Sequence, residues 1–228
     1  MHIKGILLTG LIISCLPNLL QAQTDTLRKR DGKDWEFIQT RNAVNLVEEE
    51  GYLYKGKVEG VWNSYWSSQY PKTVTTYRDG KRNGMHMEVY ADGAIKLIEN
   101  YKNGKLDGPR KEYKLRGPII LTELYSDGQK HGPYVKYFNS GRIKEQGSYV
   151  YDKKDGQLTW YYDNGHPAAT YTYREDVMEG DAAIYNDKGG IKEMGQYKND
   201  KKDGVWKIYD EEGQVIREET YKNGVKKK

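Results

Sequence analysis

The sequence predicts an all-β protein in which tandem 24-residue β-hairpins form an elongated, twisted, single-layer antiparallel sheet. Two series of residues with this spacing carry the prediction. Glycines recur at Gly60, Gly84, Gly108, Gly132, Gly156, Gly180 and Gly204, and tyrosines recur at Tyr77, Tyr101, Tyr125, Tyr149, Tyr173, Tyr197 and Tyr221. A fixed period of this length is the signature of a repeat architecture, in which each unit packs only against its neighbours.

Each period contains two segments with strand character and two turns. In the last period, residues 205–209 are aromatic and β-branched, and residues 215–221 alternate without proline or glycine. Both patterns favour strands. The first turn ends on a glycine such as Gly141, which favours a type I turn closed by a left-handed residue with a bulge. The second turn, as in residues 101–108, is rich in residues that tolerate positive φ.

The two faces of the predicted sheet differ in composition. Counted from the leading glycine, the fifth, eleventh and seventeenth positions are mostly Tyr, Ile and Tyr, so we expect a cross-strand ladder on one face. Even positions mix aromatic with charged residues and predict the binding face. The candidate contact residues there are Trp62, Trp66, Tyr134, Trp160, Tyr162 and Trp206. The alternative is that these six rings pack along the sheet or against the N-terminal cap.

The pattern Gly-x-Trp-x-x-Tyr, then Asn-Gly, then Tyr-x-x-Gly-x-x-Asp-Gly resembles the bacterial variant of the MORN repeat, over roughly residues 52–225. The units are less glycine-dense than the eukaryotic pattern. The resemblance implies an elongated single-layer sheet with a binding or scaffolding role, since lipid and protein contacts are known for MORN proteins. It also implies an alternative, because some bacterial relatives are labelled as antitoxin components of toxin–antitoxin systems.

Composition supports a folded sheet of one layer. The chain has 228 residues with 21 Tyr and five Trp but only two Phe, and 31% of its residues are charged. A thick two-layer core needs more aliphatic side chains than this, whereas disordered chains lack aromatic residues. Tyrosines that bury the ring and expose the hydroxyl suit a single layer.

The N-terminus predicts export. Lys4 precedes the apolar run of residues 6–16, and Leu20-Gln21-Ala22 resembles a signal-peptidase site, so we expect a signal peptide over residues 1–22 with cleavage after Ala22. The alternative is a lipoprotein anchored at Cys15. Either way the protein is expected to be periplasmic or associated with the outer membrane.

The remaining chain divides into two parts. Residues 23–51 are expected to form a polar linker and an irregular N-terminal cap, because residues 35–50 do not match the repeat in phase. Residues 52–228 are expected to form the repeat domain of about seven hairpins.

The residues predict no catalytic site, no cofactor and no metal. His86, His131 and His166 stand at different positions of the repeat, so we expect surface histidines that do not converge. The stretch from Asp152 to Gly156 lacks the alternating oxygen ligands of a calcium loop and is better explained as a turn. The predicted function is therefore a non-catalytic exported scaffold, with an antitoxin-like partner that neutralises a toxin protein as the alternative.

Charge and composition bound the partner. The net charge is only +4, and the basic residues concentrate in turns such as Lys153-Lys154 and Lys201-Lys202. We expect a protein, a glycan or a membrane surface of the cell envelope as ligand, with weak contact of the Lys-rich turns to anionic membranes as a further expectation. Nucleic acid is not expected, because an exported chain seldom meets it.

Overall fold

The computed structural model describes residues 25–228, which form one antiparallel sheet of 21 strands. This confirms the predicted all-β repeat sheet. The strands are β1 (Asp25–Asp31), β2 (Trp35–Arg41), β3 (Val47–Tyr54), β4 (Lys57–Tyr65), β5 (Pro71–Arg78), β6 (Lys81–Val89), β7 (Ile95–Lys102), β8 (Lys105–Leu106), β9 (Gly108–Tyr113), β10 (Ile119–Ser126), β11 (Gln129–Lys130), β12 (Gly132–Tyr137), β13 (Ile143–Val150), β14 (Lys153–Lys154), β15 (Gly156–Tyr161), β16 (Pro167–Arg174), β17 (Val177–Tyr185), β18 (Ile191–Lys198), β19 (Lys201–Tyr209), β20 (Val215–Lys222) and β21 (Val225–Lys226).

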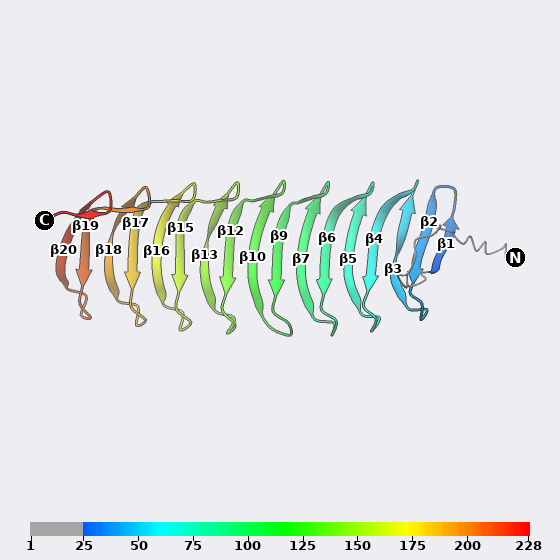
Figure 1. Ribbon diagram of the computed structural model, residues 1–228, viewed down its shortest axis with the longest axis horizontal. Helices are drawn as coiled ribbons and strands as arrows, with labels where there is room; N and C mark the ends of the chain where they lie inside the picture. The colour runs from blue at the N-terminus through cyan, green and yellow to red at the C-terminus, as the bar shows by residue number, and fades with distance from the viewer. Residues whose placement is uncertain (1–24) are drawn as a thin grey trace, which may run out of the picture.

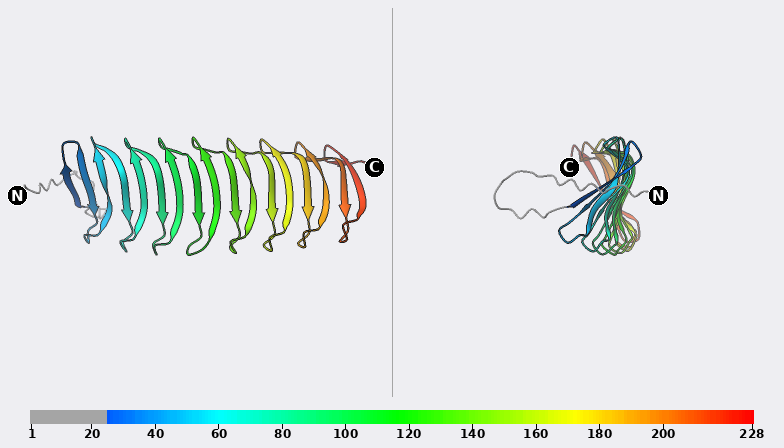
Figure 2. Two further views of the ribbon diagram at one scale, coloured as in Figure 1. Left: turned by 180° about the vertical axis from the view of Figure 1, so that it is seen from behind. Right: turned by 90° about the vertical axis from the view of Figure 1, so that its right-hand side faces the viewer.

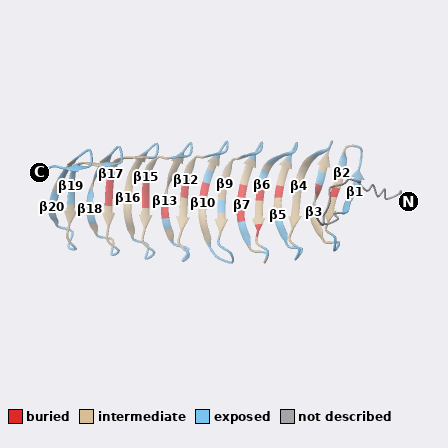
Figure 3. Ribbon diagram, viewed as in Figure 1, coloured by how far each residue is buried: buried red, intermediate tan, exposed pale blue. Residues whose placement is uncertain are grey.

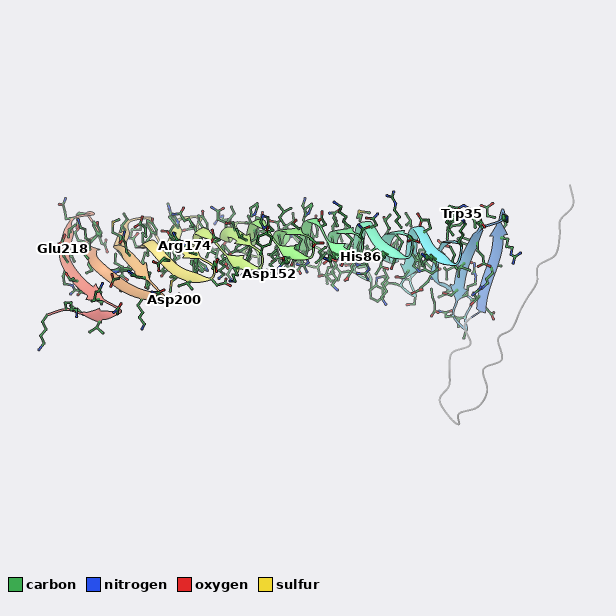
Figure 4. All side chains as sticks on the ribbon, turned by 90° about the horizontal axis from the view of Figure 1, so that it is seen from above. Trp35, His86, Asp152, Arg174, Asp200 and Glu218 are labelled. Carbon is green, nitrogen blue, oxygen red and sulfur yellow. The ribbon has the colours of Figure 1, made fainter. Side chains whose placement is uncertain are left out.

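The sheet is a continuous meander that grows along one axis. Each long strand pairs antiparallel with the strands before and after it in sequence, so β1 and β20 lie at opposite ends of the sheet (Figure 1). The end-on view shows the gradual twist of a single layer (Figure 2), and a view down the strands shows side chains leaving both sides of that layer (Figure 4). Within the described residues, no helix has the length and apolarity to span a bilayer.

The first turn of each repeat has the predicted left-handed closing residue. Gly141 has φ 84° and its amide donates to the carbonyl of Phe138 at 2.9 Å. The equivalent residue keeps positive φ even where it is not glycine, as at Gln69 (φ 65°) and Asn45 (φ 63°). The repeat around residue 117 differs, because Arg116 takes the positive φ of 51°.

The second turn is a two-residue type I′ turn with positive φ at both central residues. Asn103 and Gly104, with φ of 52° and 86°, connect β7 to β8. Three repeats place aspartate at the second position, and its carboxylate compensates with a bond to the preceding repeat. The amide of Lys130 donates to Asp152 Oδ1 at 2.8 Å, and that of Lys154 to Asp176 Oδ1 at 2.8 Å. Asp200 accepts from the amide of Met178 in the same way, at 2.8 Å.

The N-terminal prediction needs two corrections. Residues 25–31, expected to be linker, form β1 and pair along their whole length with β2. Their polar, charged side chains fit an edge strand that faces solvent on both sides. Residues 35–50, expected to be irregular, belong instead to a repeat over residues 36–59 that is in phase with the others: Glu36 pairs with Leu53 as Gly60 pairs with Tyr77. Substitution of the marker glycine and tyrosine hides this phase in the sequence. The predicted signal peptide, the cleavage after Ala22 and the alternative anchor at Cys15 lie outside the described residues.

The predicted distribution of tyrosines between the faces is partly wrong. Tyrosines of the seventeenth position pack against residues of the second: Tyr101 against His86, and Tyr149 against Tyr134, with ring centroids 6.2 and 4.7 Å apart. Tyrosines of the fifth position bond instead to the other face, as Tyr161 does when its hydroxyl accepts from Gln146 Nε2 at 2.7 Å. A register shift beside each bulged turn adds one residue, so odd and even positions exchange faces between the two strands of a hairpin.

Candidate binding face

One central row of residues runs along the sheet and holds most of its buried side chains. Its members face one another across adjacent strands at mid-strand, where burial concentrates (Figure 3). We call the side of the sheet that carries this row the aromatic face. The row is Ile38, Gly51, Trp62, Thr75, His86, Glu99, Arg110, Glu123, Tyr134, Gly147, Leu158, Tyr171, Ala182, Gly195, Trp206 and Glu219.

Large side chains in the row lie over glycines on the neighbouring strand. The indole of Trp206 covers Gly195, the indole of Trp62 covers Gly51, and Leu158 covers Gly147. Trp206 is fully buried, at 0% exposure, although the sheet has no second layer. The missing side chain of the glycine leaves the space into which the ring lies flat, so a single layer can bury a tryptophan.

The middle of the row is polar and held by ion pairs. Arg110 donates from Nε to Glu99 Oε1 at 2.9 Å and from Nη1 to Glu123 Oε2 at 3.2 Å, and it also binds Glu112. Lys130 Nζ lies 2.5 Å from Glu123 Oε1. Burial opposes the charge of Arg110, but hydrogen bonds to Glu112 and Glu99 raise its pKa. These partners satisfy charges that would otherwise be costly to bury.

Tyr134 and Glu145 form a second buried polar pair. The hydroxyl of Tyr134 donates to Glu145 Oε1 at 2.6 Å, and Lys136 Nζ donates to Glu145 Oε2 at 3.0 Å. Burial and this hydrogen bond raise the pKa of Tyr134. Burial alone would raise the pKa of Glu145, but the bonds from Tyr134 and Lys136 outweigh it and lower that pKa. Tyr134 therefore stays protonated and Glu145 stays ionised, which are the states that this hydrogen bond requires.

Lysines lie over the aromatic rings of this face. Lys202 Nζ is 3.8 Å from the ring centroid of Trp206 and 5.5 Å from that of Tyr221. Lys154 stands 5.9 Å from the ring of Trp160 and 5.4 Å from that of Tyr173. The face thus combines ring surfaces with cations held above them at cation–π distance.

The six predicted contact residues separate into two groups. Tyr134 and Trp206 are 1% and 0% exposed, so the prediction that they contact a partner is wrong, and the packing alternative is correct for them. They are buried because their rings lie beside the glycines at 147 and 195. The other four stay partly exposed: Trp62, Trp66, Trp160 and Tyr162.

Each of the four partly exposed rings is also anchored. Trp66 Nε1 donates to the carbonyl of Val89 at 2.9 Å, and the hydroxyl of Tyr162 donates to the carbonyl of Tyr185 at 2.9 Å. Trp160 packs edge-on against Tyr171 at 5.4 Å between centroids. Trp66 and Tyr162 are thus held by the next repeat, Trp160 by the other strand of its own hairpin, and Trp62 by Gly51 of the preceding strand, while all four rings still offer part of their surface.

Three further tyrosines, which the periodicity alone does not place on this face, complete an aromatic cluster. Tyr171 lies between Trp160 and Tyr197, with its ring 5.7 Å from that of Tyr197, and Tyr173 shares Lys154 with Trp160. All are partly exposed. We call Trp160, Tyr171, Tyr173, Tyr197 and Lys154 the aromatic cluster. The 24-residue period predicts that tyrosines such as Tyr173 and Tyr197 share one face. Only the strand register shows that this face is the aromatic face.

The histidines do not meet, and one of them was predicted wrongly. His86 is buried at 4% exposure, with Nδ1 2.8 Å from Thr75 Oγ1, so it is a row residue and not a surface histidine. His131 stacks at 4.8 Å on Tyr151, and His166 is exposed. Among residues 25–228, no group of three or more His, Cys, Asp or Glu could hold a metal ion.

Hollows on the described surface are shallow features of the repeat. One of about 340 Å³ lies beside the ion pairs and is lined by residues such as Glu88, Leu97 and Arg110. Another of about 360 Å³ lies at the type I′ turns around Arg174 and Asn199. Both hollows are open to solvent, so the extended face is the better candidate site.

Comparison with protein families decides the repeat type. The model of the MORN repeat variant matches residues 130–151, 154–175 and 202–223. These three segments begin at the same point of the repeat and each covers one hairpin, in phase with the structure. These three segments are MORN-variant repeats. MORN repeats are typically non-catalytic binding repeats.

Other comparisons add little to the MORN-variant assignment. No curated protein matches the chain. Among solved structures, a chain of the Photorhabdus luminescens Tc holotoxin pore is similar at 11% identity with a TM-score of 0.26. The match covers 88% of this chain but only 13% of that one. At this score the likeness carries no argument about function.

Proposed function

We propose that this MORN-variant chain is an exported, non-catalytic scaffold whose aromatic face binds another protein of the bacterial cell envelope. The observation that carries the proposal is the aromatic cluster, in which partly exposed Trp160, Tyr171 and Tyr197 form contiguous ring pairs. Tyrosine and tryptophan are enriched at the centre of protein interfaces. A protein partner therefore suits this face better than a glycan or a membrane surface.

Preorganisation of the rings supports binding of a protein. Trp160 is held edge-on by Tyr171, and Lys154 lies over the rings of both Trp160 and Tyr173. Rings that are fixed before association lose little conformational entropy when a partner covers them. Because the same strands continue on both sides, the partner can contact several repeats at once.

Export supports the envelope as the location, and it rests on the N-terminal sequence. The apolar run and Leu20-Gln21-Ala22 favour cleavage after Ala22, which would leave Gln23 as the mature N-terminus. Mass spectrometry of the protein purified from its host tests this directly. A mass that fits a diacylated Cys15 would instead make the protein a lipoprotein.

The binding face is tested with a double variant on the aromatic face and a single variant, next to it in sequence, on the opposite face. Trp160→Ala with Tyr173→Ala removes rings of the aromatic cluster, whereas Tyr161→Ala removes a ring that bonds to Gln146 on the other face. We expect an envelope protein that is enriched by the wild type and by Tyr161→Ala, with at least about tenfold weaker binding of the purified partner to the double variant.

Several outcomes would contradict the proposal. Equal affinity of the wild type and the double variant would remove the aromatic cluster from the binding site. Binding to purified envelope glycan or to anionic vesicles that depends on Trp160, with no protein enriched, would assign the face to that ligand class instead. Circular dichroism of both variants ensures that they are compared in the folded state.

Neutralisation of a toxin protein is the form of protein binding that the family resemblance suggests. The properties of the captured protein distinguish this antitoxin-like role from a scaffold role. A captured protein that inhibits growth when expressed alone, and is suppressed by the wild type but not by Trp160→Ala with Tyr173→Ala, would assign the antitoxin-like role. A partner without toxicity would leave the scaffold role alone.

A further inference from the structure

The side of the sheet opposite the aromatic face is almost free of charge over its central part. We call this surface the plain face. It consists of the two sequence neighbours of each central-row residue from Trp62 to Tyr171, which pair with one another across the strands. Lys111 is the one charged residue in this set, whose other members are Val, Met, Ile, Leu, Pro and uncharged polar residues.

The plain face leaves apolar surface open to solvent. Val61, Met85 and Leu124 are 48%, 42% and 36% exposed. Val74, Met87 and Ile98 extend the apolar surface between them. Apolar side chains on one face of a sheet are normally buried against a second layer, and the described residues supply no such layer.

We propose that the plain face binds the plain face of a second copy of this chain, so that two single-layer sheets stack into a dimer. The area of the patch falls in the range of stable dimers. The ten long strands from β4 to β16 are spaced about 4.8 Å apart, and the two plain-face side chains of each cover about four residues at about 3.3 Å, which gives a surface of about 600 Å². Stable dimers bury about 600–1,000 Å² on each partner.

Shape and charge both favour a second copy as the occupant. A two-fold contact places the same patch against itself, so a patch with net charge would repel its copy, and this one holds only Lys111. Apart from Lys111, the nearest charged neighbours of the row lie beyond the patch, at Glu50 on one side and Asp181 on the other. A copy of the chain also has the same twist and strand spacing, which aligned packing of two sheets requires.

The dimer would leave both aromatic faces outward. The proposal does not depend on the function of the aromatic cluster, because Trp160 and Tyr173 lie on the other side of the layer from Met85 and Leu124. Failure of one proposal therefore leaves the other standing.

Sedimentation of the full chain over a range of concentrations tests the dimer. We expect the wild type to reach twice the mass of one chain, and Met85→Glu with Leu124→Glu to weaken association at least about tenfold, since a two-fold contact buries each new charge twice. Ile216→Glu is the matched control, because Ile216 is 62% exposed and lies outside the patch. It should dimerise as the wild type does.

X-ray scattering of the wild type gives an independent test of the dimer, because it needs no substituted variant. The cross-section should thicken by about 10 Å as the dimer forms, the distance between stacked sheets. A wild type that stays monomeric at all concentrations would overturn the proposal and leave the plain face to another protein. A dimer without thickening, or one that Ile216→Glu disrupts as strongly as the double variant, would also overturn it.

Discussion

The indole of Trp206 lies flat on Gly195 of the neighbouring strand: a Cβ added to Gly195 would lie 2.5 Å from Cδ2 of the ring. The indole Nε1 also donates to the carbonyl of Gln196 at 3.1 Å, and Lys202 covers the ring. Three groups from β18 and β19 thus help to bury a tryptophan in a sheet of one layer. This contact predicts how a methyl group added at residue 195 changes the stability of the protein.

Gly195→Ala should destabilise the protein by about 2–4 kcal/mol, although alanine is normally better than glycine in a strand interior. The methyl group would displace Trp206 and expose its ring. Urea unfolding of the single variants and of Gly195→Ala with Trp206→Ala measures the coupling. The two substitutions should cost clearly less together than the sum of their separate costs. Strict additivity would show that the ring and the glycine are not coupled.

The left-handed residue of the first turn gives a second prediction. At Gly141 we expect unfolding free energy to fall in the order Asn, Ala, Val, with about 1 kcal/mol lost for Ala and more for Val. An added Cβ would meet nothing closer than Pro118 at 3.8 Å, so the cost is conformational. Asn45 already occupies the equivalent position with φ 63°. If Asn were as damaging as Val in a denaturant titration, the left-handed conformation would not be the reason for glycine here.

The regular parts of the fold could be predicted from the sequence, and the register could not. Residues such as Gly141 and Tyr149 repeat with a fixed period, which gives the hairpins and the turn type directly. The face of Tyr149 depends on a register shift of one residue between Lys136 and Tyr137, which no periodicity shows. That shift moves Tyr149 onto Tyr134 and explains why Tyr134 is buried and not a contact residue.

The phase of the first repeat was hidden for a similar reason. Asn45 replaces the turn glycine and Glu36 the leading glycine, although the hydrogen bonds are those of the other repeats. Asparagine tolerates positive φ, so the turn keeps its conformation although the residue type no longer follows the repeat pattern. The partner chemistry of the aromatic cluster likewise depends on which rings meet across strands, as Trp160 and Tyr171 do.

The aspartates of the type I′ turns give a third prediction. Asp176 has φ 71°, and its carboxylate accepts from the amide of Lys154 at 2.8 Å. Asp176→Ala keeps the strained conformation and loses the bond, so it should cost about 1–2 kcal/mol. Asp176→Gly loses the bond but relieves the strain, as glycine does at 128. Thermal melts should rank Gly above Ala, and the reverse order would exclude this compensation.

The polar centre of the row gives a fourth prediction. Arg110→Met should destabilise by about 3–5 kcal/mol, because it leaves the buried carboxylates of Glu99 and Glu123 without their shared partner. Adding Glu99→Gln and Glu123→Gln to Arg110→Met removes both charges and should recover part of the loss. Urea unfolding measures each step. No recovery in the triple variant would mean that packing of the Arg110 stem, and not charge, sets the cost.

Tyrosine titration gives the last prediction, a loss of stability in alkali. Burial, together with Glu50 near Tyr65 and Glu123 near Tyr125, raises the pKa of each tyrosine to about 12. An unfolded chain releases these protons near pH 10, so between about pH 10 and 12 it binds fewer protons than the folded chain. Stability is therefore complete below about pH 10 and should fall as the pH rises through this window.

Urea unfolding at a series of alkaline pH values checks the slope. The variant Tyr65→Phe with Tyr125→Phe should lose less stability over the window than the wild type, because it has two fewer protons to release on unfolding. The lysines are the same in both proteins, so their titration cancels in the comparison. An identical slope in the variant and the wild type would mean that these two hydroxyls ionise in the folded state near their ordinary pKa.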